Sequence, residues 1–111
     1  MSELALADPI LTRIKNELRV LYGTRLKRVL LYGSRARGDH RPDSDYDILV
    51  VLEGQIEGWP DRKLATLSDK ILRETIAEGE PAVVSFKPMT EEQALQRTGF
   101  MHNVRLDSIE L

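Results

Sequence analysis

The sequence predicts a small α/β (α+β) domain, in which a mixed sheet of three to four strands is flanked by helices. Helix-like and strand-like hydrophobic patterns alternate along the chain. The strand-like runs are short and almost wholly apolar, which is typical of strands covered on both faces. The chain has 111 residues, enough for one domain and little more. We therefore treat residues 1–111 as a single domain.

The first half of the chain predicts a helix and two strands. Asp8-Pro9 is a helix start, because aspartate is a favoured N-cap and proline fits the first helical position. Apolar residues then recur at helical spacing up to Gly23. The run from Val29 to Tyr32 predicts a buried strand, and the run from Tyr46 to Leu52 predicts a second one.

The second half predicts a helix capped by Asp61, a third strand over Pro81–Phe86 and a last helix. A capping box at Thr90 opens that last helix, which we expect to end near Gly99. Phe100–Leu111 is ambiguous and fits a short helical turn followed by a terminal strand. The inward stripe expected on the helix after Asp61 is Leu64, Leu67, Ile71 and Ile76.

Composition excludes several functional classes. Cysteine is absent and there are two histidines, so disulfides, thiolate zinc sites and His-rich metal centres are excluded. No apolar run approaches the roughly 20 residues that span a bilayer, and the N-terminus lacks the basic segment of a signal peptide. We expect a cytoplasmic protein with no membrane partner. A net charge of −2 is too balanced to give a strong nucleic-acid signal.

Charge is unevenly distributed along the chain. From Arg25 to Arg41 there are six basic residues and one acidic residue, whereas from Asp43 to Glu92 there are five basic and twelve acidic ones. Such blocks are usually solvated surface. They also fit a basic loop that binds a polyanion beside metal-binding carboxylates, and the motifs decide between the two.

The segment between the first two strands favours an anion site. Gly33-Ser34 follows a strand, and a short helix after it would expose backbone N–H groups at its N-terminus. Glycine permits the turn and the close approach of a phosphate, and the Ser34 hydroxyl adds a donor. Arg35 and Arg37 are placed to neutralise further phosphate charge. A lone Gly-Ser, by contrast, is most often a turn.

The same segment ends in a candidate metal site. Asp45 and Asp47 are two residues apart at the start of a strand, so both carboxylates are expected on one face. Paired carboxylates beside a phosphate site are what Mg²⁺ needs to bridge protein and triphosphate. This arrangement suits phosphoryl or nucleotidyl transfer. Taken alone, an Asp-x-Asp pair is more often a solvated strand entry.

Gly33-Ser34, ten intervening residues and Asp45-Tyr46-Asp47 resemble the signature of the DNA-polymerase-β-like nucleotidyltransferases. The fuller string GSRARGDHRPDSDYDILVVLE is similar to the minimal nucleotidyltransferases (MNT), which are often encoded beside a HEPN-domain partner. The resemblance implies a nucleotidyltransferase fold, ATP as substrate and Mg²⁺, with a second metal ion left open. It implies that Gly33 and Ser34 contact the triphosphate and that Asp45 and Asp47 hold metal.

The resemblance also implies a function and a partner. The chain would transfer a nucleotidyl group, AMP in most of the family, to a hydroxyl of a HEPN-type partner, as the antitoxin of a toxin–antitoxin pair. The expected third strand, Pro81–Phe86, lacks the third carboxylate of the family's full active site, and Ser85 is the residue expected in its place. Glu78 and Glu80 precede that strand and more readily form a solvated helix end. The alternative is therefore a binding module that neutralises its partner by docking alone. The acceptor, the base preference and homo-oligomerisation stay open.

Overall fold

The computed structural model describes residues 8–54, 56 and 62–111 of the chain. The helical elements are α2 (Pro9–Tyr22), the 3-10 turn η1 (Gly23–Arg25), α3 (Ser34–Arg37), α4 (Arg62–Ala77), α5 (Glu91–Ala94) and α6 (Gly99–Asp107). The strands are β1 (Leu26–Tyr32), β2 (Tyr46–Leu52), β3 (Val84–Thr90) and β4 (Ile109–Glu110). This mixture of elements confirms the α/β (α+β) class.

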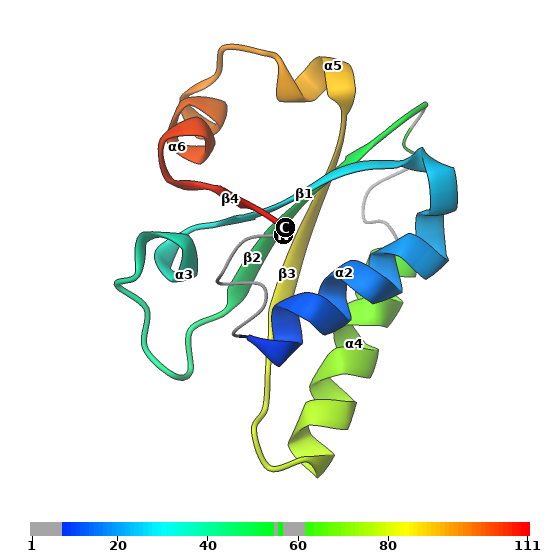
Figure 1. Ribbon diagram of the computed structural model, residues 1–111, viewed down its shortest axis with the longest axis vertical. Coiled ribbons are helices and arrows are strands. Elements are labelled where there is room, and N and C mark those ends of the chain that lie inside the picture. Colours follow the sequence, from blue (N-terminus) through cyan, green and yellow to red (C-terminus); the bar gives the residue numbers. More distant parts are fainter. Residues whose placement is uncertain (1–7, 55, 57–61) are drawn as a thin grey trace.

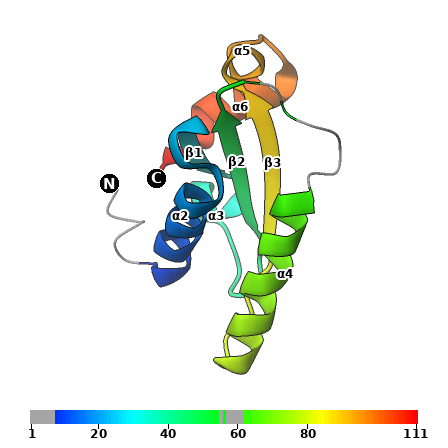
Figure 2. The ribbon, with the colours of Figure 1, turned by 90° about the vertical axis from the view of Figure 1, so that its right-hand side faces the viewer.

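The four strands form one mixed sheet in the order β3-β2-β1-β4. β1 runs antiparallel to both β2 and β4, whereas β2 and β3 are parallel. A parallel pair needs a crossover, and α4 supplies it. α2 and α4 pack on one face of the sheet, and α5 and α6 lie on the other (Figures 1 and 2). No helix in the described ranges is long and apolar enough to cross a membrane.

β2 is apolar throughout because both of its faces are covered. Ile48, Val50 and Leu52 point into the core beneath α2 and α4, whereas Leu49 and Val51 belong to the core beneath α5 and α6. All five side chains are at most 1% exposed. The near-continuous hydrophobic run in the sequence therefore correctly indicated that β2 is an inner strand, covered on both faces.

Asp8 joins the start of α2 to the start of β2. Its Oδ1 accepts a hydrogen bond of 2.9 Å from the Ile10 N–H, which confirms it as the N-cap. Its Oδ2 accepts a 2.7 Å bond from the Tyr46 hydroxyl. Burial, together with this bond, raises the pKa of Tyr46. The residue between the two candidate metal ligands is thus anchored to the opposite face of the sheet.

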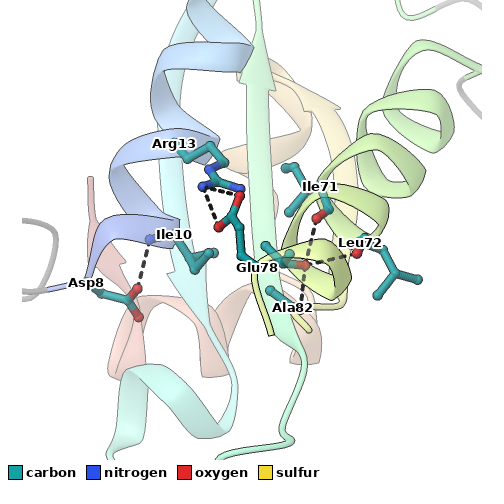
Figure 3. Close-up of polar contacts among 8 residues, drawn as sticks. Asp8, Ile10, Arg13, Ile71, Leu72, Glu78 and Ala82 are labelled. Atoms are coloured by element: carbon teal, nitrogen blue, oxygen red, sulfur yellow. Dashed lines mark hydrogen bonds and ion pairs between the residues drawn. The ribbon is translucent and has the colours of Figure 1, made fainter. Parts of the chain in front are cut away.

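The end of α4 is fixed to the segment that enters β3 (Figure 3). The buried residue near the end of α4 is Thr75, whereas Ile76 is 56% exposed, so the expected stripe was wrong at its last position. Position 75, four residues after Ile71, continues the same helical stripe. Oγ1 of Thr75 lies 2.7 Å from the Ile71 carbonyl and accepts a 2.9 Å bond from the Ala82 N–H. The expected cap of this helix, Asp61, lies outside the described residues.

Three expected element boundaries also differ from the structure. β1 begins at Leu26 rather than at Val29. β3 spans Val84–Thr90 rather than Pro81–Phe86, because it is an edge strand, where the missing N–H of Pro88 is tolerated. The capping box at Thr90 is present, but α5 ends at Ala94 and a separate helix, α6, follows. The last residues form β4, so the helical turn and terminal strand are confirmed.

Candidate nucleotide and metal site

The Gly33-Ser34 turn joins the end of β1 to α3, and Figure 1 shows the following loop returning to the start of β2. Gly33 is the N-cap of α3 with φ +76°, a conformation that favours glycine. A Cβ at this position would overlap Oδ2 of Asp47. The Asp47 carboxylate of the neighbouring strand thus lies against the residue that caps α3. Glycine is therefore required both for its conformation and for this close approach.

Asp47 lies opposite Tyr32 in the β1–β2 register. Burial raises the pKa of the Asp47 carboxyl, repulsion from Asp45 raises it further, and Arg37 opposes the rise. Within the described part of the chain, neither aspartate accepts a hydrogen bond or forms an ion pair with another side chain. The two carboxylates, that of Asp47 partly buried and that of Asp45 exposed, supply the oxygen donors that Mg²⁺ prefers.

The parallel register of β2 and β3 pairs Asp47 with Ser85. Ser85 thus stands on the strand position next to the aspartates, and it is exposed. Glu78 turns away to α2, where it forms a 2.9 Å ion pair with Arg13, and Glu80 lines a cavity of about 910 Å³ beside α2. Among the described residues, no three His, Cys, Asp or Glu side chains come together as metal ligands.

The structure places the two expected arginines differently. Nε of Arg35 donates to the Ser44 carbonyl at 2.9 Å, and its guanidinium lies 3.9 Å from the centre of the Tyr46 ring. This side chain braces the loop on the face opposite Asp47. Arg37 is exposed and pairs with Asp39 at 3.3 Å, close enough to the aspartates to act on the pKa of Asp47. The geometry thus groups Arg37 with Asp47 and directs Arg35 into the loop.

A second cavity, of about 220 Å³, opens beside the turn. Gly33, Tyr32 and Arg37 line one side of it, and Phe100 and Asn103 of α6 line the other. α6 was ambiguous in the sequence, so these neighbours of the turn could not be identified there. The sequence contained one indication of a further residue on the sheet face of Asp47. Ser85 and Lys87 are polar and two residues apart, as expected of strand residues on one face.

Two candidate protein adenylyltransferases of Methanocaldococcus jannaschii are similar to short segments of the chain. One is 50% identical over 36 residues, which is 32% of this chain and 36% of that protein. The other is 36% identical over 44 residues, which is 40% of this chain and 44% of that protein. The matched segments thus span less than half of each relative.

A solved structure described as a toxin–antitoxin with AMP-PNP shares the fold. Its TM-score is 0.62 at 19% identity, over 89% of this chain and 69% of the other. The model of the nucleotidyltransferase domain family matches residues 11–101. That span includes the turn, the paired aspartates and the strands β1, β2 and β3, and the chain belongs to the nucleotidyltransferase domain family.

Proposed function

We propose that the chain binds ATP with Mg²⁺ and transfers its AMP group to a hydroxyl of a partner protein. The observation that carries this proposal is the Asp47 carboxylate, which is partly buried against Gly33 and close enough to the exposed Asp45 for repulsion to raise its pKa. Neither aspartate forms an ion pair among the described residues. Family membership supports nucleotidyl transfer as the reaction class. The names of the two archaeal relatives support a protein acceptor.

Each residue of the site has a role in this reaction. Asp45 and Asp47 would hold Mg²⁺, which supplies charge neutralisation and orients the phosphates when bound. Gly33 and Ser34 bind the β- and γ-phosphates at the start of α3, and Arg37 offsets charge on the pyrophosphate. The acceptor oxygen forms a bond to the α-phosphorus as the bond to pyrophosphate breaks, and pyrophosphate leaves with the electron pair. The acceptor's proton passes to solvent.

The partner we propose is a HEPN-type toxin, with this chain as its antitoxin. The toxin–antitoxin assignment of the structural neighbour supports such a pair. The described residues form one sheet with its covering helices, and an acceptor hydroxyl on another polypeptide is consistent with that arrangement. Positioning of this hydroxyl by docking would then supply much of the rate acceleration.

One observation favours a second function, in which the chain neutralises its partner by docking alone. Ser85 occupies the strand position beside Asp47, and a hydroxyl is a poor general base and a weak magnesium ligand. General-base assistance typically contributes 10²–10⁴-fold. The first function therefore predicts slow transfer that is measurable only with the partner present.

Incubation with labelled ATP, Mg²⁺ and the proposed HEPN-type partner separates the two functions. Transfer of label to the partner, lost in the double variant Asp45→Asn/Asp47→Asn, is the result expected of the enzyme. Ser85→Asp should raise the rate, because it restores a carboxylate beside Asp47. Neutralisation of the partner without any incorporated label, in wild type and double variant alike, would establish docking as the function.

A further inference from the structure

Three side chains form a row across the sheet face that carries Asp47. Nζ of Lys87, on β3, lies 3.9 Å from the centre of the Phe100 ring of α6. The Phe100 ring in turn meets Tyr32 of β1 edge-on, at 5.4 Å between centroids and 86° between planes. β2 lies between β3 and β1 in the sheet. The row therefore passes over β2, the strand that carries Asp47.

The register places Lys87 on the same face as Asp47. Asp47 is paired with Ser85 and Leu49 with Lys87, and alternate residues of a strand share a face. At the far end of the row, burial raises the pKa of Tyr32 and the charge of Asp47 raises it further. Lys87 thus shares a sheet face with Asp47, and Tyr32 is close enough for the charge of Asp47 to raise its pKa.

The charges on this face are complementary but not paired. Lys87 is exposed, and no carboxylate among the described residues lies within ion-pair distance of its ammonium. Its contact is with the face of an aromatic ring, an interaction that leaves the ammonium free to donate hydrogen bonds. Asp45 and Asp47 also form no ion pair with a described residue, although Arg37 is close enough to act on the pKa of Asp47. A ligand that carries both a metal ion and phosphate oxygens would supply a cation to the two carboxylates and an anion to the Lys87 ammonium.

We propose that the Lys87 ammonium binds the α-phosphate of the nucleotide. The inference rests on the proposed function and adds a residue to the same site. Ser34 and α3 lie on the β1 side of the aspartates and Lys87 on the β3 side, so the triphosphate would extend toward the turn and its α-phosphate toward Lys87. With two carboxylates rather than three, the site has fewer ligands for a second metal ion. An ammonium on the same face of the sheet supplies positive charge there.

The test compares charge removal with charge retention at one position. Lys87→Met keeps the apolar stem against Phe100 and removes the charge, and Lys87→Arg keeps the charge. Lys70→Met is the matched control, because Lys70 lies on α4, across the sheet, where it pairs with Glu17. Calorimetric titrations with ATP and Mg²⁺, and with AMP and Mg²⁺, measure the affinities, and circular dichroism confirms the fold of each variant.

We expect Lys87→Met to lose about tenfold in affinity for both nucleotides, since both contain the α-phosphate, and Lys87→Arg to retain most of it. Lys70→Met should bind like wild type. A loss for ATP with AMP unchanged would overturn the α-phosphate assignment. Wild-type affinity in Lys87→Met would overturn the role of Lys87 and leave the proposed function standing. Failure of the wild type to bind ATP would overturn both.

Discussion

Gly33 combines two requirements that can be separated by experiment. Its φ of +76° strains any other residue, and its missing Cβ leaves room for Oδ2 of Asp47. Gly38, at the other end of α3, has a φ of +85° but has nothing within 4 Å of an added Cβ. The two glycines are therefore a matched pair for substitution. A side chain at Gly33 would strain the backbone and also collide with Asp47, whereas a side chain at Gly38 would only strain the backbone.

We predict that Gly33→Ala abolishes calorimetric binding of ATP with Mg²⁺, because the added methyl displaces Asp47. Gly38→Ala should destabilise the fold by roughly 1–3 kcal/mol through backbone strain and should still bind the nucleotide. Both free energies of unfolding come from urea titration. Equal nucleotide affinity in the two variants would show that contact with Asp47 has no part in binding.

Asp47 makes the stability of the free protein fall as pH rises. Its pKa is raised by burial and by Asp45, so the folded state holds this proton more tightly than the unfolded state. Stability is greatest below the ordinary aspartate pKa and is lost as pH rises through the higher folded value. Mg²⁺ should reverse the trend, because it favours the charged form.

Asp47→Asn should therefore melt at a higher temperature than the wild type at neutral pH, and the difference should shrink toward acid pH. Melting curves recorded between pH 3 and pH 7 measure this. Asp69→Asn, at an exposed position on α4, controls for loss of a negative charge. A lower melting temperature for Asp47→Asn at neutral pH would contradict the assigned cause of the shift.

Among the elements, α4 and β3 show how a hydrogen bond positions a strand. Thr75 is 1% exposed, and its hydroxyl accepts the Ala82 N–H where the chain turns toward β3. Thr75→Val leaves that N–H without an acceptor and should destabilise the protein by about 1–3 kcal/mol. Urea unfolding measures the loss, with Thr66→Val on the exposed side of α4 as control. Equal free energies of unfolding would exclude this role.

The elements that the sequence predicted well are those whose cause is local. Asp8 as N-cap, the apolar run of β2 and the capping box at Thr90 all depend on neighbouring residues, and all are confirmed. The extension of β3 past Pro88 depends on its place at the sheet edge, which no local pattern reveals. The candidate site follows the same rule. The spacing of the motif predicts that Gly33 lies near Asp47, whereas Lys87 reaches the sheet face of Asp47 only through the register of β2 and β3.

At the scale of the whole molecule, the hydrophobic cores on the two sides of the sheet differ in size. In the described residues, the core beneath α2 and α4 contains sixteen buried residues, and the core beneath α5 and α6 contains seven. Segments with fewer buried apolar contacts open at a lower free energy. The candidate site lies on the thinner side, where ordering by a ligand has the larger effect.

Hydrogen exchange should reveal this asymmetry. We predict that amides of α5 and α6 exchange faster than those of α2 and α4 in the free protein. Saturating ATP with Mg²⁺ should slow exchange in α6, whose residues line the cavity beside Gly33. Uniform protection of all four helices in the free protein would contradict the prediction.

The brace formed by Arg35 has a consequence for how the length of the chain can vary. Arg35 holds the carbonyls of Pro42 and Ser44, the residues that lead into Asp45, so both ends of the loop are fixed to one guanidinium. Surface loops ordinarily absorb inserted residues at small cost. Here an extra residue between Gly38 and Ser44 would have to break the brace or displace Asp45. The ten residues between Ser34 and Asp45 thus have a fixed length, and we expect inserted residues to be tolerated in other turns and not in this loop.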